Sequence, residues 1–245
     1  MGFKSSLLVY SSGEPADLLR QPAVPDPAQT GALVAATHPG WTGTGGSADG
    51  SLDDCIHPPE GFVYAGRLPG IDILCDRDVM VDYPSQLPAQ YHGPGAGRRM
   101  ILHAFHSVVD WFAYAIWQDG VLLRSLSLSR HTGGVIEDIG TPLPFELPFW
   151  ADGRPARPEP GKPTPFRLPF HPFELSEAAL SALMGFTQGG RPAESGVDAW
   201  AVPLIGFEVP SANPITQADM DEFLRTHRRR HYRLGPGGEL IPVAD

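Results

Sequence analysis

The stretch WFAYAIWQDGVLLRSLSLS, residues 111 to 129, decides the fold class of this chain. Asp119-Gly120 stands between two apolar runs, and this dipeptide is the strongest short-range signal of a β-hairpin, because a type I′ turn needs positive φ at both central residues. Counting outward from the turn gives three opposed pairs: Trp117 with Leu122, Ala113 with Leu126, and Trp111 with Leu128. Large side chains then meet on one face with alanines between them, as cross-strand packing favours. The sequence therefore predicts a hairpin over residues 111–128.

The segment ILHAFHSVVD, residues 101–110, lies directly upstream and carries His103, His106 and Asp110. On a helix the three polar side chains would share one face, as a metal site or a general base would need. On a strand His103 and His106 point to opposite faces. A helix leading straight into the strand at Trp111 would need a break, and the stretch between has no Gly, Pro or Asn to make one. We therefore favour a strand with a bulge or bend at residues 107–110, with the helix as the alternative.

Other strands are expected on both sides of this region. Strand-like apolar runs occur at SSLLVYSS (residues 5–12), on both sides of Pro69-Gly70 in residues 62–81, and at AWAVPLIGFEV (residues 199–209). Proline cannot donate a hydrogen bond to a neighbouring strand, so Pro203 should confine the last of these to a sheet edge or a bulge. Residues 40–60 are expected to be a loop because they are rich in Gly, Ser and Asp.

Helices are expected at four places, each marked by a start signal. Pro15 opens a short one, and Asp26 caps another with Pro27 at its first position and Gln29 completing a capping box. The third is LSEAALSALMG, which Ser176 should cap and Gly185 should end. The fourth is residues 216–233, which end in the basic run RTHRRRHYR. These cations suit a helix C-terminus, and the alternative is a docking patch for an acidic partner.

Residues 142–172 differ in character from the rest of the chain. They contain ten prolines, interleaved with the aromatic residues Phe145, Phe149, Trp150, Phe166 and Phe170. A plain linker would be polar, so we interpret the segment as extended chain wrapped over the core. Strands and helices are mixed without βαβ alternation. The sequence therefore predicts a single α+β domain over residues 1–245, with a mostly antiparallel sheet and a few short helices.

Composition narrows the classes of function. The hydrophobic content is 42%, the formal net charge is −10 and the pI is about 5.3, which disfavours non-specific nucleic-acid binding. No apolar run approaches the ~20 residues of a membrane span, so we expect no membrane partner. The two cysteines, Cys55 and Cys75, are too few for a secreted disulfide scaffold, and we expect a cytoplasmic protein. The partner would be a small molecule or a protein, and the sequence identifies no cofactor.

Candidate catalytic residues gather at the expected bend. His106, Ser107 and Asp110 lie there, and irregularities of this kind are frequent beside active sites. The stretch DDCIHPPE offers a Cys–His pair, but it lacks the ligand spacing of a zinc site, and a loop with an unpaired thiol is the simpler interpretation. We predict no metal site.

Candidate ligand-binding residues are of two kinds. Arg124 stands in an apolar register, and a buried arginine needs a carboxylate partner or a ligand anion. His103 and three tryptophans could line an apolar pocket: Trp111, Trp117 and Trp150.

Several blocks of the chain resemble a known family. They are KSSLLVY, LHAFHSVVDWFAYAIWQDGVLLRSLSLS, IGTPLPFELPFWADG, LPFHPFEL and IGFEV. In wording and order they resemble an actinobacterial family catalogued only as a domain of unknown function. The resemblance implies a single soluble intracellular domain of this length. It implies no activity, so no catalytic residue is carried over from it.

Three functions remain open at this point. The first is a non-catalytic module that binds a small molecule or a protein, suggested by the supply of Trp and Phe in extended chain. The second is a hydrolase or lyase in which His106 and Asp110 act as acid and base while Arg124 steadies an anionic substrate. That version requires His106 and Arg124 to share one cleft. The third is an immunity or regulatory protein that binds a partner through its acidic surface, with strong salt dependence.

Overall fold

The computed structural model describes residues 2–20, 23–43, 46, 48–130, 134–151, 168–190 and 196–210, with the backbone of residues 232–234 and 240–242. The chain forms two compact units, residues 1–210 and residues 211–245. The prediction of one domain over residues 1–245 therefore stays a prediction. None of the helices in these described ranges has the length and the apolar content needed to cross a membrane.

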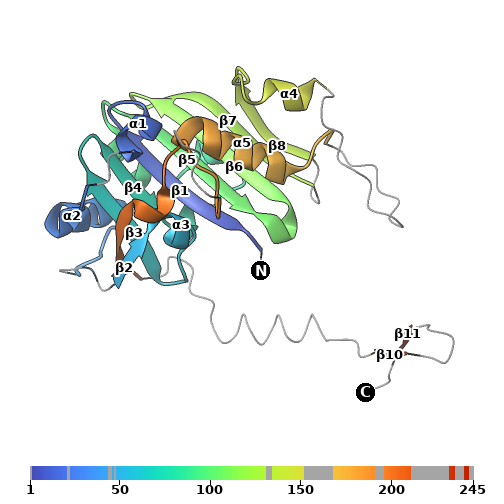
Figure 1. The fold of residues 1–245 in the computed structure, drawn as a ribbon, viewed down its shortest axis with the longest axis horizontal. Coiled ribbons are helices and arrows are strands. Elements are labelled where there is room, and N and C mark those ends of the chain that lie inside the picture. The colour runs from blue at the N-terminus through green and yellow to red at the C-terminus, as the bar shows by residue number, and fades with distance from the viewer. Residues whose placement is uncertain are drawn as a thin grey trace. The chain divides into compact units, whose positions relative to one another are not determined.

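The described part of the first unit is built on one antiparallel sheet of nine strands (Figure 1). Their order across the sheet is β2-β9-β3-β4-β1-β5-β6-β7-β8. The strands are β1 (Lys4–Ser11), β2 (Ala48–Ser51), β3 (Phe62–Leu68), β4 (Ile71–Cys75), β5 (Arg99–His106), β6 (Trp111–Gln118), β7 (Val121–Ser129), β8 (Gly134–Gly140) and β9 (Pro203–Glu208). The helices are α1 (Pro15–Leu19), α2 (Pro27–Thr37), α3 (Leu52–Cys55), α4 (Leu147–Trp150) and α5 (Pro172–Met184). The predicted α+β class is confirmed.

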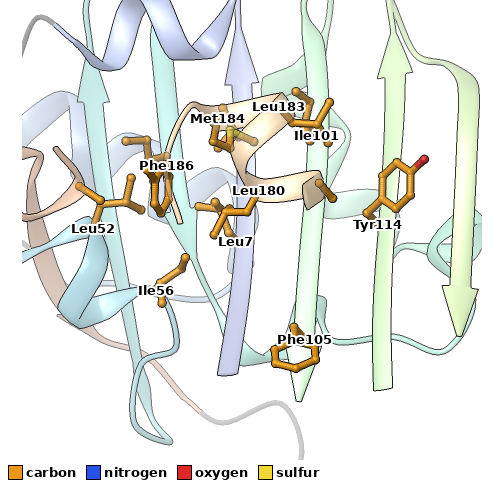
Figure 2. Packing of buried hydrophobic residues seen from close by; sticks show 14 of the residues in the cluster. Leu7, Leu52, Ile56, Ile101, Phe105, Tyr114, Leu180, Leu183, Met184 and Phe186 are labelled. Atoms are coloured by element: carbon orange, nitrogen blue, oxygen red, sulfur yellow. The ribbon is translucent and has the colours of Figure 1, made fainter. Parts of the chain in front are cut away.

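Both faces of the sheet are covered, so two apolar cores form. The α5-side core takes one set of alternate strand residues and includes Leu7, Ile101, Tyr114, Leu180 and Met184. Figure 2 shows part of this core, with Leu180, Leu183 and Met184 coming from α5. The α2-side core takes the other set and includes Leu8, Leu33, Val34, Leu102 and Trp117. Burial on both faces explains why the run LLVY in β1 is apolar without alternation.

The predicted hairpin is β6–β7, and its register shifts by one residue beyond the turn. Asp119 and Gly120 have φ of 52° and 78°, as the turn requires. Trp117 does face Leu122, but the pairing then skips Leu123. Two predicted pairs are therefore wrong: Ala113 faces Ser127, and Trp111 faces Ser129. Counting outward from a turn cannot detect such a bulge, because the skipped residue changes every pair beyond it.

Residues 99–106 form the strand β5, so the helix alternative for this region is wrong. A short 3-10 turn follows at Ser107–Val109, and Asp110 reverses the chain with a left-handed φ of 46°. A short polar residue such as aspartate tolerates this conformation. The predicted bend is thus confirmed, and His103 and His106 lie on opposite faces of the sheet.

Three predictions about individual elements need correction. Helix α5 begins at Pro172 with His171 as its N-cap, not at Ser176, because Pro172 is suited to the first helical position. The expected loop of residues 40–60 contains β2 and α3. Strand β9 is not at the edge, since the four-residue β2 lies outside it. Pro203 is tolerated there because it is the first residue of β9.

The described parts of the Pro/Phe-rich segment pack on the α5-side core. Phe149, Leu168 and Phe170 are buried in it, and Phe145 and Trp150 pack against it. The segment includes the short helix α4 and so is not extended throughout. Phe166 lies outside the described residues.

The second unit contains β10 (Tyr232–Leu234) paired antiparallel with β11 (Leu240–Pro242). The fourth predicted helix and its basic run lie outside the described residues as far as His231. Their last two residues, Tyr232 and Arg233, belong to β10 instead. A helix ending at Arg233 is therefore wrong over its final residues.

Candidate functional site

Arg124 lies fully buried in an ion pair with Glu146, which comes from the Pro/Phe-rich segment. Its Nε donates to Oε1 of Glu146 at 2.9 Å, and its Nη2 donates to Oε2 at 2.6 Å. Its Nη1 donates to the carboxylate of Asp138 and to the carbonyl of Ile139. A bidentate guanidinium–carboxylate pair is a strong, geometrically specific contact. The structure thus provides Arg124 with protein partners, and a ligand-anchoring role for it stays a prediction.

Further donors complete the environment of Glu146. Tyr114 donates to Oε1 at 2.5 Å, the amide of Leu143 donates to the same oxygen at 2.6 Å, and the Trp150 indole lies 3.4 Å from Oε2. Burial alone would raise the pKa of Glu146, but the hydrogen bonds from Arg124 and Tyr114 outweigh it and hold the pKa below its ordinary value. This network fixes the Pro/Phe-rich segment to β6 and β7. The sequence carried a signal for this network, because Glu146 is the one charged residue among the prolines and apolar residues of the stretch 142–150.

His103 is buried, its ring nitrogens have protein partners, and ligand binding by it stays a prediction. Its Nε2 lies 3.0 Å from the carbonyl of Ser176, and its Nδ1 lies 2.9 Å from the Ser5 hydroxyl. A carbonyl can only accept, so Nε2 carries the proton and Nδ1 accepts from Ser5. Burial lowers the pKa of His103 to about 4. The imidazole is therefore neutral at physiological pH.

The three predicted catalytic residues lie at the end of β5 and in the bend that follows it, and their catalytic role stays a prediction. The Asp110 carboxylate binds Arg130 at 3.0 Å and lies 3.4 Å from Nε2 of His171. His106 has the strand parity of Leu102 and Ala104, which face the α2-side core, whereas Arg124 faces the α5-side core with Glu146. Ser107 lies in the 3-10 turn. His106 and Arg124 are thus on opposite faces of the sheet.

The three tryptophans pack within the fold. Trp111 and Trp117 are 7% and 3% exposed in the α2-side core. Trp150 packs edge-on against Phe170, with ring centroids 4.9 Å apart. Burial also raises the pKa of the Cys55 thiol, which disfavours the reactive thiolate. The three tryptophan side chains pack in or against the two cores, and ligand binding by them stays a prediction.

A cleft that the sequence did not indicate lies at the end of the sheet where β1 and β3 finish and β4 begins. Its volume is about 590 Å³. Its lining combines residues from these strand ends with the start of α2: Ser12, Val24, Asp26, Gln29, Arg67, Leu68, Pro69, Gly70, Asp72 and Arg98. We call it the Arg67/Arg98 cleft.

Asp72 organises the two arginines of this cleft. Its buried carboxylate accepts from Arg67 at 3.2 and 3.0 Å and from Arg98 at 2.6 Å. Arg98 also donates to the carbonyl of Tyr10 at 2.6 Å, and its Nε is buried without an acceptor. Arg67 keeps 34% of its side chain exposed. Two guanidinium groups in the lining of the cleft thus share one carboxylate.

The fold and the cleft define an α+β protein with a nine-stranded antiparallel sheet and a polar cleft at one end of it. Residues 5–207 match a family of unknown function (DUF6928), and the chain belongs to that family. No curated protein and no solved structure matches the chain.

Proposed function

We propose that this protein is a non-catalytic binding module that takes a small polar molecule in the Arg67/Arg98 cleft. The observation that carries the proposal is the cleft itself. Its volume of about 590 Å³ falls within the range of small-molecule sites, roughly 300–1,000 Å³. Its lining places polar groups beside the apolar side chains of Leu68, Pro69 and Val24.

The arginines suit a ligand that carries hydrogen-bond acceptors. Arg67 uses Nε and Nη2 to bind Asp72, so its Nη1 is left for an acceptor on a ligand. Asp72 holds the guanidinium groups in place before binding, which reduces the entropy lost when a ligand is captured. A carboxylate or an amide carbonyl is the acceptor that this arrangement fits best.

The hydrolase or lyase alternative receives no such support. It required His106 and Arg124 in one cleft, and the two side chains project from opposite faces of the sheet. A partner-binding regulatory role is the remaining alternative, and the experiment below separates it from small-molecule binding.

The test is a native mass spectrum of the untagged protein beside its denatured mass, supported by a thermal-shift screen of small carboxylates and amides. We expect a non-covalent adduct, or a stabilising compound, that Arg67→Leu abolishes. Arg99→Leu is the matched control, because Arg99 pairs with Glu14 on the surface and does not line the cleft. A ligand retained by Arg67→Leu, or a wild-type protein that neither carries an adduct nor responds to the screen, would contradict the proposal.

A further inference from the structure

Most basic side chains in the described part of the first unit have an acidic partner. Of its eight Lys and Arg residues, six form ion pairs with Asp or Glu: Arg20, Arg67, Arg98, Arg99, Arg124 and Arg130. The two that form none within this described part are Lys4 and Arg77. Such a pair of unmatched cations is unexpected in a chain with a net charge of −10.

The histidines show the same division. Six lie in the ranges that the structure describes, and four of them have hydrogen-bond or ion-pair partners: His38, His92, His103 and His171. Within those ranges His57 and His106 have no hydrogen bond or ion pair to the side chain of another residue, and Nδ1 of each ring is buried without a partner.

These four unmatched groups lie together at one end of the sheet. Lys4 is paired with His106 in the register of β1 and β5. The Ser6 amide donates to the carbonyl of Ile56, which brings His57 alongside β1. The Ser6 carbonyl accepts from the amide of Asp76, which places Arg77 there as well. The first residues of β1 therefore join all four, which we call the basic cluster.

The pKa values of the two histidines reflect this proximity. Burial and the charges of Arg77, Lys4 and His106 lower the pKa of His57 to about 4. Burial and the charge of Lys4 also lower the pKa of His106. Lys4 and Arg77 are the charged side chains that lower both pKa values, so positive potential reaches both imidazoles. Burial raises the pKa of Asp78, the acidic residue that follows Arg77 in the chain, and the charge of Arg77 opposes that rise.

A buried hydrogen-bond donor without an acceptor lies beside the cluster. Trp111 is opposite His106 in the register of β5 and β6 and is 7% exposed. Its Nε1 has no hydrogen-bond partner. An indole nitrogen can only donate, and an unpaired buried donor is unfavourable in a folded protein. The site therefore offers cations and donors and needs acceptors.

We propose that Lys4, His57, Arg77 and His106 form a binding site for an oxyanion, the phosphate or carboxylate group of a small molecule. Lys4 and Arg77 supply permanent charge, and the imidazoles become stronger donors once an anion favours their protonated form. The site lies at the N-terminal end of β1, whereas the Arg67/Arg98 cleft begins at Ser12, beyond the other end. The two sites are therefore independent.

The experiment is a titration of the full chain with inorganic phosphate, with sodium chloride at equal ionic strength as the reference. The readouts are the imidazole NMR resonances of His57 and His106 and the melting temperature. We expect saturable shifts of both resonances and a higher melting temperature. If phosphate leaves the resonances where chloride leaves them, the proposal is overturned.

Variants separate the basic cluster from the overall charge. We expect Lys4→Gln/Arg77→Gln to weaken phosphate binding by about tenfold or more, because it removes two charge-assisted contacts. The control Arg20→Gln/Arg99→Gln removes the same charge at exposed ion pairs and should bind within about twofold of wild type. Equal losses in the two double variants would overturn the site. His106→Gln, with an unchanged circular dichroism spectrum, gives a second test if the first variant folds poorly.

Discussion

Arg124 and Glu146 are each almost completely buried, so the charge of each depends on the other. Replacing Glu146 alone leaves Arg124 with only the half-exposed carboxylate of Asp138, and breaking a buried pair typically costs about 3–5 kcal/mol. We expect Glu146→Leu to lower the free energy of unfolding by about that amount, measured by urea denaturation. The double variant Arg124→Met/Glu146→Leu should recover most of the loss, because it leaves neither charge unpaired. A single-variant loss below about 1 kcal/mol would show that the pair is not a main stabilising contact.

His103 gives a second prediction, on the pH dependence of stability. Its pKa is about 4 in the folded protein and about 6.5 in an unfolded chain. Below pH 6.5 the unfolded chain binds a proton that the folded protein does not, so stability is complete above pH 6.5 and falls as the pH drops towards 4. The loss is about 3 kcal/mol. Urea denaturation from pH 7 to pH 4 should show this loss in wild type relative to His103→Asn, and parallel pH profiles would contradict it.

At the scale of single residues, the sequence indicated which side chains require a hydrogen-bond or ion-pair partner, but it did not indicate which residue supplies that partner. It indicated that Arg124 required a carboxylate or an anion, yet it did not point to Glu146, which is 22 residues away in a different segment. It placed His103 and His106 on opposite faces, since strand parity is a local property. It missed the basic cluster, because Lys4, His57, Arg77 and His106 meet only through the pairing of strands that are distant in sequence.

Helix α5 depends on the residue that ends it, and this gives a third prediction. Gly185 has a φ of 80°, and a Cβ there would lie 2.8 Å from Cβ of Ala16 and 3.1 Å from Cγ2 of Val197. We expect Gly185→Ala to lower the free energy of unfolding by about 2–4 kcal/mol, from backbone strain together with overpacking. Gly120→Ala is the matched control, with a φ of 78° and open space around it, and should lose only about 1 kcal/mol. Equal losses in thermal or urea denaturation would show that strain alone acts at Gly185.

Local signals predicted the β6–β7 hairpin and the start of α2 correctly, but the signal at Ser176 gave the wrong start for α5, and features that depend on neighbouring strands were not predicted. Asp119-Gly120 marked the β6–β7 hairpin, and Asp26 does cap α2 by accepting from the amide of Gln29 at 2.8 Å. The bulge at Leu123 has no local signature. It shifts the pairing so that Arg124 faces Ile116 and joins the α5-side core with Tyr114. The register of a strand is set by what its faces bury, which a single sequence does not specify.

At the scale of the whole molecule, residues 1–210 contain the nine-stranded sheet, and the family match to residues 5–207 lies within the same unit. We therefore expect a chain ending at Pro210 to fold by itself. Its melting temperature should lie within about 2 °C of the full chain, a difference below that of a 1 kcal/mol change in stability. Calorimetry of both chains checks this, and loss of the cooperative transition in the shorter chain would contradict it.

The central position of β1 has a consequence for biosynthesis. Its neighbours in the sheet are β4, which ends at Cys75, and β5, which ends at His106. A ribosome adds about 5–20 residues per second. The interval between synthesis of β1 and synthesis of both neighbouring strands is therefore on the order of 5–20 s. During that interval the LLVY run, which is buried in the finished protein, is exposed on the nascent chain. We expect it to be the segment that a ribosome-associated chaperone binds first.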